Sequence, residues 1–334
     1  MGNTKRINSI DFFRIISCFL IVCIHLNFYE VGTVRWYSRF AVLFFFVISG
    51  YFFTLCNEEK QIKQIKKIGK LTLIFHLFYF IEEIIVSFIK HKSFSLNNYI
   101  KISSVLTGVF PFAYHLWFLN ALVISLGVLY LFRKKGVSNK IILIVSTLLI
   151  LINLSIGTYG KFLLNLSITP DFVANWLLIG IPFVFIGSLI SNIKEEKYFK
   201  FKNIFLIGIL ISILLMYLEL KIISLIGWNT FDNSIGAMIL SVMLIFYSLC
   251  NPMSNNKIIG YMANIGKKYS LYIYIFHPVI NGVFEFIIEK LNIGIINNIY
   301  YYGSPFIVFI FSLFFSILYV FVLDKIKKLK NVNI

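Results

Sequence analysis

Residues 10–26 read IDFFRIISCFLIVCIHL, and they lie inside a longer apolar stretch, residues 9–30. About 20 predominantly apolar residues are enough for an α-helix to cross the hydrocarbon core of a bilayer. The stretch does not resemble a cleavable signal peptide, because its apolar run is too long, Arg14 and His25 interrupt it, and no small-residue cleavage site follows. It therefore predicts a first membrane-spanning helix.

Similar apolar stretches recur along the whole of the 334-residue chain. The ten predicted spans are residues 9–30, 37–56, 71–90, 114–132, 140–157, 172–192, 203–220, 233–250, 268–289 and 304–324. Hydrophobic residues make up 59% of the chain and charged residues 13%, which excludes both a soluble globule and a disordered chain. We therefore predict an all-α membrane protein, in which residues 1–334 form a single bundle of about ten transmembrane helices without a soluble domain.

The basic residues are distributed unequally between alternate connections of these spans. One side of the predicted bundle carries 22 of the 31 lysines and arginines, and the other side carries 8. Because cytoplasmic loops are enriched in Lys and Arg, both termini are predicted to be cytoplasmic. The same scatter over short loops accounts for the net charge of +17, so no nucleic-acid partner is expected.

The four cysteines are Cys18, Cys23, Cys56 and Cys250, and each lies in or at the edge of an apolar stretch. They contain no CxxC pair, so the sequence indicates neither a disulfide framework nor a zinc site. We interpret them as small core residues and expect no metal.

Arg14 and His25 are eleven residues apart in the first predicted span. At about 100° per residue this spacing is three turns plus about 20°, so both side chains project from one stripe, separated by roughly 16 Å along the axis. Asp11, at i−3, can pair with Arg14. Ionisable groups at membrane depth favour a functional site, here transfer chemistry across the bilayer. The alternative is that Arg14 snorkels towards the headgroups and His25 makes a polar interhelical contact.

Two of the three further histidines in predicted spans are candidate site residues. His115 opens the fourth span beside Trp117, and His277 lies near the centre of the ninth span, directly before Pro278. Each is a candidate acid, base or acceptor contact. The alternatives are that Trp117 is an interfacial anchor and that His277 is a buried structural residue.

Residues 60–70 read KQIKQIKKIGK, with isoleucines on one side and lysines on the other. This basic amphipathic pattern predicts a segment on the inner leaflet, attracted to anionic membrane lipid. A second interpretation is a docking edge for a phosphorylated cytosolic cofactor, because Lys binds phosphate as a point charge.

Four segments follow one another in the order RIISCFLIVCIH, FFFVISGYF, HLWFL and SLYIYIFHP. Together they resemble acyltransferase family three. RIISCFLIVCIH (residues 14–25) carries the Arg-x10-His signature of that family's first span, preceded by the customary Asp11. FFFVISGYF (residues 44–52), which contains Ser49 and Tyr51, resembles its second-span segment. HLWFL (residues 115–119) and SLYIYIFHP (residues 270–278) resemble its fourth-span and late-span signatures.

The resemblance implies an integral-membrane O-acetyltransferase of the bacterial cytoplasmic membrane. Such an enzyme moves acetyl from cytosolic acetyl-CoA to a hydroxyl of an extracytoplasmic or lipid-linked carbohydrate. Arg14 and His25 match the family's essential pair. Lys67 and Lys70 fall where many members carry an Arg-x-x-Arg pair associated with CoA binding; lysines retain the charge but lose the bidentate geometry.

His25 is expected to act either as a general base or as a transient acyl carrier, and the sequence does not separate the two. A transporter or flippase of a lipid-linked sugar or acyl precursor is the competing class, and a sensor or accessory subunit is a third. The sequence does not determine the acceptor glycan, the acyl group beyond acetyl, the oligomeric state or the roles of Glu82 and Glu83.

Overall fold

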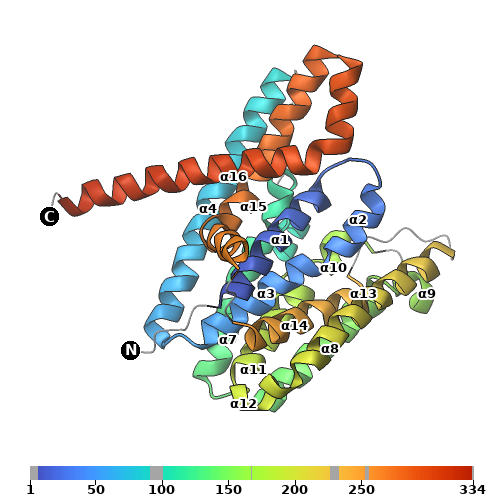
Figure 1. Ribbon diagram of the computed structural model, residues 1–334, viewed down its shortest axis with the longest axis vertical. Helices are drawn as coiled ribbons and strands as arrows, with labels where there is room; N and C mark the ends of the chain where they lie inside the picture. The colour runs from blue at the N-terminus through green and yellow to red at the C-terminus, as the bar shows by residue number, and fades with distance from the viewer. Residues whose placement is uncertain (1–6, 91–100, 167, 226–232, 253–255, 333–334) are drawn as a thin grey trace. The chain divides into compact units, whose positions relative to one another are not determined.

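The structure is a computed structural model, and it describes residues 7–90, 101–166, 168–225, 233–252 and 256–332. Within these ranges every regular element is helical and no strand occurs. The chain forms two compact units, one spanning Val42–Cys250 and the other combining Lys5–Ala41 with Asn251–Ile334. Figure 1 shows the helices of both units in chain order by colour.

Eight helical segments of the described chain are long and apolar enough to cross a membrane. They are Asn8–His25, Val31–Thr54, Glu58–Ile89, Ile102–Lys134, Asn139–Ile156, Glu195–Leu225, Lys257–Leu291 and Gly294–Leu329. Two shorter apolar helical segments, Trp176–Ser191 and Ile235–Cys250, coincide with the sixth and eighth predicted spans. The prediction of an all-α membrane protein is confirmed, whereas the number of crossings and the side of each terminus stay predictions.

Several helix ends differ from those predicted. Helix α1 (Asn8–His25) ends five residues before the predicted boundary, because Leu26 adopts an extended backbone conformation (φ −103°, ψ 155°). Glu30, in the left-handed region at φ 55°, then precedes helix α2 (Val31–Ser38). The predicted second span therefore begins within α2 and continues in α3 (Phe40–Thr54).

The basic segment 60–70 and the third predicted span form one continuous helix, α4 (Glu58–Ile89). Asn57 begins it, since its side chain accepts a hydrogen bond from the backbone N–H of Lys60 at 3.1 Å. No proline interrupts residues 58–89, so nothing in the sequence separates the amphipathic turns from the apolar ones. The predicted separate surface segment is thus the first part of a long helix.

The larger unit contains α3 from Val42 onward and the elements up to residue 250. After α4 these are α6 (Ile102–Thr107), η1 (Pro111–Leu116), α7 (Trp117–Lys134), α8 (Asn139–Ile156), α9 (Gly160–Leu164), α10 (Pro170–Val173), η2 (Trp176–Gly180), α11 (Ile181–Ser191), α12 (Glu195–Tyr198), η3 (Phe199–Phe201), α13 (Lys202–Leu225) and α14 (Ile235–Cys250).

Glycine permits direct backbone contact between α3 and α11 in this unit. A Cβ atom added at Gly50 would overlap the carbonyl oxygen of Val184, and one added at Gly187 would overlap that of Val47. Close approach through small residues is a general device of helix packing in membranes. Each helix contributes a single glycine here, so the GxxxG pattern is absent although the packing is tight.

Glu219 of α13 holds the beginning of α14. Its carboxylate accepts hydrogen bonds from the backbone N–H groups of Ile235 at 2.9 Å and Gly236 at 3.0 Å, and from the hydroxyl of Tyr159. A negative charge at this position satisfies otherwise unpaired amides and complements the helix dipole. A buried acid therefore has a structural role in joining two spans.

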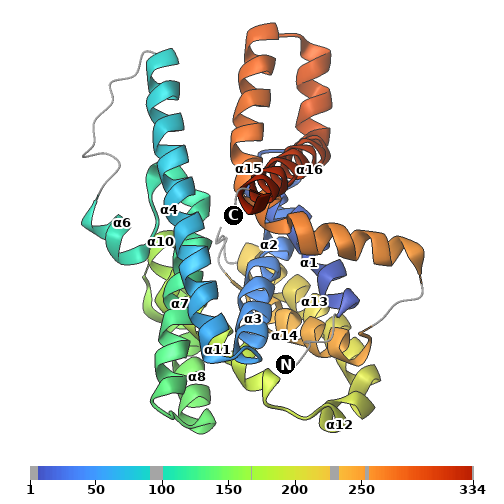
Figure 2. The same cartoon turned by 90° about the vertical axis from the view of Figure 1, so that its left-hand side faces the viewer.

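The second unit consists of α1, α2, α15 (Lys257–Leu291) and α16 (Gly294–Val332). Parts of α15 and α16 run side by side as an antiparallel hairpin, and α16 changes direction along its length, with Pro305 inside it (Figures 1 and 2). Prolines are a common cause of such bends.

Helix α1 packs against α15 in a parallel arrangement. A Cβ atom at Gly266 would overlap the carbonyl oxygen of Asp11. Further along, the Cys18 thiol donates to the carbonyl of Ser270 at 3.3 Å, as expected of a small core cysteine. Positions on the two helices thus meet in the same order, and this register brings the end of α1 beside the middle of α15.

Candidate functional site

Three of the predicted site residues lie on α1. Asp11 is 5% exposed, and it accepts a hydrogen bond from Nη1 of Arg14 at 2.7 Å. The predicted i,i+3 pair is therefore present. A guanidinium held by a carboxylate in this way has a fixed position.

The predicted site residues His25 and His277 are neighbours in this unit. The centroids of their rings are 5.1 Å apart, with an angle of 42° between the ring planes. His277 is fully buried, and it comes from α15, the helix that lies along α1. The sequence places these residues far apart, and the register of two helices brings them together.

Pro278 determines how the His277 ring is held. A proline has no N–H, so Pro278 cannot donate to the carbonyl of Tyr274 four residues earlier. Nδ1 of His277 lies 2.7 Å from that same oxygen. Because a carbonyl oxygen only accepts, Nδ1 carries a proton and donates it to Tyr274. The side chain of His277 thus takes the place of the N–H that Pro278 lacks, and this hydrogen bond fixes the orientation of the ring.

Arg35 of α2 binds the C-terminal end of α1, beside His25. It donates from Nε to the carbonyl of Ile24 at 2.8 Å, and from Nη2 to the carbonyl of Leu26 at 2.8 Å and to Oδ1 of Asn27 at 3.0 Å. The last carbonyls of a helix lack partners within it, and a cation there also complements the helix dipole. Arg35 therefore fixes the backbone on both sides of His25.

Arg39 adds a second positive charge to this region, since electrostatic interactions link His25 to His277, Arg39 and Arg35. Neither arginine was among the predicted site residues, because both were interpreted as charges of a short connection. The sequence did offer one indication of their role. Both arginines follow closely after His25, in a connection on the side of the predicted bundle that carries few basic residues. The structure thus adds two arginines to the histidine pair.

The remaining predicted residues belong to the larger unit. Ser49 donates its hydroxyl to the carbonyl of Phe45 within α3 at 2.7 Å. Tyr51 is 9% exposed and lies edge-to-face with Phe52. Trp117 begins α7, and its ring lies 6.1 Å from that of Phe46. The contact between Phe46 and Trp117 packs the second-span motif against the fourth-span motif.

His115, which was predicted to open the fourth span, lies near the end of η1 with 6% of its surface exposed. Its ring makes an edge-to-face contact with Tyr79 of α4, with ring centroids 4.5 Å apart. The histidine is therefore packed between η1 and α4 rather than presented on an open surface.

His76 has a structural role that its position in a span did not reveal. Nδ1 lies 2.8 Å from the carbonyl of Thr72 and must donate to it, so Nε2 accepts from Nδ2 of Asn120 at 3.1 Å. The same Asn120 amide donates to the carbonyl of Gly108 at 2.5 Å. Both ring nitrogens are thus engaged, and His76 joins α4 to α7.

A family model for the acyltransferase domain of acyltransferase family 3 matches residues 7–325. The chain belongs to acyltransferase family 3. The resemblance inferred from the four motifs is confirmed by this match, and the match covers nearly the whole chain. The long apolar helices of the described chain are those of a multi-pass membrane protein of this family.

A curated relative of this chain is an amino-acid racemase from Enterococcus faecalis, which is 28% identical over 234 residues. The match covers 61% of this chain and 31% of the racemase, so the chain spans about a third of that relative's length. No solved structure matches the chain.

Lys67 and Lys70 lie on the exposed side of α4. Their three-residue spacing places them on neighbouring turns of one face. Among the described residues of this chain, no group of three or more His, Cys, Asp or Glu side chains is arranged to hold a metal ion.

Proposed function

We propose that the protein is a membrane O-acetyltransferase of the bacterial cytoplasmic membrane. It takes acetyl from cytosolic acetyl-CoA and transfers it to a hydroxyl of an extracytoplasmic or lipid-linked carbohydrate, such as a capsule, exopolysaccharide or cell-wall glycan. The observation that carries the proposal is the pairing of His25 with His277 in a member of an acyltransferase family. An imidazole held in place by its neighbours is the group that acyl transfer to a hydroxyl requires.

In the direct route, His25 acts as a general base. A sugar hydroxyl oxygen attacks the thioester carbonyl carbon while its proton passes to the His25 ring. The C–S bond then breaks, an ester C–O bond remains, and the departing CoA thiolate takes the proton from His25. His277 positions the His25 ring, because its own orientation is fixed by Tyr274.

In the second route, the His25 ring nitrogen first attacks the thioester and CoA leaves, which gives an acyl-imidazole. The sugar hydroxyl then attacks this intermediate, and the ester product and free His25 result. The two routes differ in whether acetyl becomes bound to the protein when acetyl-CoA is present without an acceptor. Both routes require His25, so both predict that His25→Ala loses acetyl transfer.

Arg14 is the proposed charge-stabilising group of the site. Its guanidinium is oriented by Asp11, and it binds either the phosphate end of CoA or the negative charge that develops on the thioester oxygen. Asp11 acts through Arg14 and is a positioning residue. In the larger unit, His115, Trp117, Ser49 and Tyr51 are proposed as supporting groups for the acceptor.

Removing Arg35 tests whether the end of α1 must be held for catalysis. Arg35→Ala leaves the carbonyls of Ile24 and Leu26 without their donors, so His25 loses its fixed position. We expect kcat to fall about tenfold, because a misplaced base costs one to two orders of magnitude, with the KM for acetyl-CoA unchanged. Arg35→Lys should recover only part of the rate, since Lys lacks the planar fork.

Lys290→Ala is the matched control for Arg35, because it removes an exposed cation from the second unit. The role assigned to Arg35 is wrong if its Ala variant keeps the wild-type kcat while the protein remains folded.

The proposed CoA contact at Lys67 and Lys70 predicts a binding defect. The double variant Lys67→Ala/Lys70→Ala should raise the KM for acetyl-CoA about tenfold with little change in kcat, because two phosphate-binding charges are lost. Replacement of both lysines by Arg should keep the low KM. The variant Lys63→Ala/Lys66→Ala is the matched control on the same helix; an equal rise in KM there would show general attraction rather than a site.

The function itself is tested with purified protein in nanodiscs. Release of CoA thiol from acetyl-CoA is measured with and without envelope glycan, and O-acetyl esters on surface glycans are compared by NMR in cells with and without the protein. The proposal predicts CoA release that depends on the acceptor and esters that depend on the protein. A transporter or flippase of a lipid-linked sugar would move its substrate without consuming acetyl-CoA.

The name of the Enterococcus relative defines a further comparison. That protein is an amino-acid racemase, and this chain matches 31% of it. Incubation of the same nanodiscs with L-amino acids, followed by chiral chromatography, measures racemisation directly. Formation of D-amino acids without any acetyl transfer would contradict the proposed acetyltransferase activity and indicate a racemase instead.

A further inference from the structure

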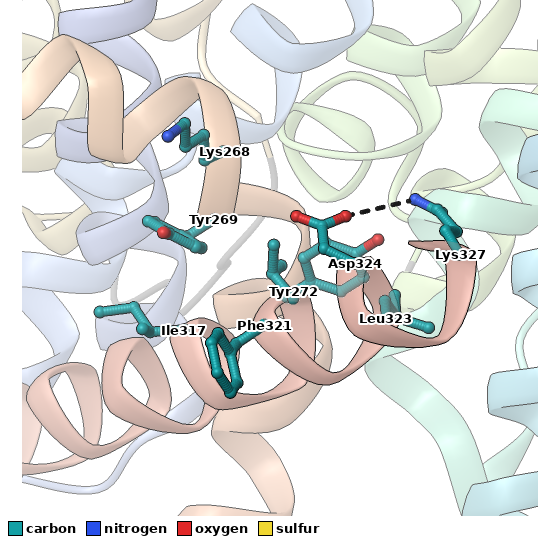
Figure 3. A pocket seen from close by; sticks show the side chains of 9 residues that line it. Lys268, Tyr269, Tyr272, Ile317, Phe321, Leu323, Asp324 and Lys327 are labelled. Atoms are coloured by element: carbon teal, nitrogen blue, oxygen red, sulfur yellow. Dashed lines mark ion pairs between the residues drawn. The ribbon is translucent and has the colours of Figure 1, made fainter. Parts of the chain in front are cut away.

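Helices α15 and α16 enclose a pocket that the proposed function does not use. Its volume is about 390 Å³, and its lining comes from both helices (Figure 3). The lining residues that matter here are Lys268, Tyr269, Tyr272, Phe321, Asp324 and Lys327. We call this the α15–α16 pocket.

The position of the pocket in the sequence places it at the edge of the membrane. Lys268 opens the ninth predicted span, and Asp324 closes the tenth, where the apolar run gives way to DKIKKLK. We therefore expect the pocket to lie at the level at which both helices pass from hydrocarbon to the polar interface. By the distribution of basic residues, this is the side predicted to be cytoplasmic.

The lining combines two chemistries. The exposed apolar side chains Ile317 and Phe321 form one wall and continue into the exposed apolar surface of α16. Lys268 and Lys327 bring positive charge, and further lysines follow at the same level. These are Lys267, Lys325 and Lys328. A ligand that matches both the apolar wall and the lysines carries a negative charge next to an apolar chain.

Asp324 is the acidic member of the pocket. Its carboxylate lies 3.6 Å from Nζ of Lys327, and both side chains are exposed, as the dashed line in Figure 3 shows. A bare phosphate would be repelled by this carboxylate. A phosphate ester with free hydroxyl groups would instead donate a hydrogen bond to it while the lysines bind the phosphate.

We propose that the α15–α16 pocket binds the headgroup of an anionic phospholipid of the phosphatidylglycerol type. Lys268 and Lys327 bind the phosphate, Asp324 accepts from the glycerol hydroxyls, and an acyl chain lies along Phe321. Basic pockets between helices at the cytoplasmic interface are suited to anionic headgroups. The phosphates of CoA share part of this chemistry, but a soluble nucleotide does not account for the lipid-facing apolar wall.

The test measures lipid retention by the full-length protein. Purified protein is exchanged into mixed micelles containing phosphatidylglycerol, phosphatidylethanolamine or phosphatidylcholine, and bound lipid is counted by native mass spectrometry. We expect selective retention of phosphatidylglycerol, and a loss of about tenfold in affinity for the variant Lys268→Gln/Lys327→Gln. Lys257→Gln/Lys290→Gln is the matched control, because it removes two charges from the second unit without touching the pocket.

A second variant tests the headgroup contact. Asp324→Asn should reduce the preference for phosphatidylglycerol over phosphatidic acid, which has no glycerol hydroxyls. Equal retention of all lipids, or equal loss in both double variants, would overturn the proposal. Displacement of phosphatidylglycerol by acetyl-CoA would also overturn it and assign the pocket to the acyl donor. Because binding is read without turnover, these outcomes are independent of acetyl transfer.

Discussion

His25→Ala is expected to abolish most acetyl transfer, with a fall in kcat of about 100- to 10,000-fold, the range that a general acid–base group supplies. The expected KM for acetyl-CoA is unchanged in the direct route, because His25 acts on the acceptor proton. His25 ends α1, and its main-chain surroundings are held by Arg35, so loss of its ring should leave the fold intact. The measurement is CoA release with glycan acceptor, together with the temperature of unfolding in detergent.

His277 supplies the matched control for this experiment. His277→Ala removes the donor to the Tyr274 carbonyl that Pro278 leaves open, so we expect a smaller loss of kcat, about tenfold, with some loss of stability. His277→Asn retains an amide donor at this position and should recover the stability more than the rate. Equal rates for wild type and His25→Ala, in folded protein, would remove His25 from the mechanism.

Gly266→Val is expected to disrupt the packing of α1 on α15. Even a Cβ atom at this position would overlap the carbonyl oxygen of Asp11, and the backbone N–H of Ile15 is also close. Overpacking a tight contact costs about 1–3 kcal/mol, and moving α1 also shifts His25 from His277. We expect a lower unfolding temperature and a loss of transfer in any protein that folds.

Two glycines of the same helix serve as controls for Gly266. A Cβ atom at Gly260 or Gly282 would meet nothing within 4 Å. Gly→Ala at either position should leave stability unchanged or raise it by up to about 1 kcal/mol, because Gly is unfavourable in a helix. If Gly266→Ala behaves like these two variants, the close contact between α1 and α15 is wrong.

The periodicity of the sequence was sufficient to predict what lies on one helix. Asp11, Arg14 and His25 fall on one helix because apolar residues surround them for long enough to span a membrane, and the predicted Asp11–Arg14 pair is present. Apolar length also located the other helical segments. Helix ends were less predictable, because α1 stops where the backbone of Leu26 turns, which composition does not reveal.

The contacts between helices could not be predicted from the sequence. The approach of His277 to His25 depends on the register of α15 along α1, and close contacts such as that of Gly266 with Asp11 accompany this register. Glu219 was missed among the ionisable residues of the spans, since its partners lie at the beginning of another helix. Arg35 was likewise interpreted as a loop charge.

The structural role of His76 illustrates the same limit. Its position in a span is similar to that of His277, and spacing does not distinguish the two. Hydrogen bonds do, because both nitrogens of His76 are engaged with Thr72 and Asn120. For His277 the bond to Tyr274 accounts for Nδ1 and follows from the neighbouring Pro278.

The most direct test of the central claim, that His25 mediates transfer of acetyl from acetyl-CoA to a carbohydrate hydroxyl, is to follow radiolabelled acetyl in one reaction. Purified protein in nanodiscs is given labelled acetyl-CoA and then envelope glycan, and label is measured in CoA, protein and glycan. We predict one alkali-labile acetyl ester on the glycan for each CoA released, and none with His25→Ala. Undiminished label on the glycan with folded His25→Ala, or glycan that stays unlabelled with the wild-type protein, would contradict the account.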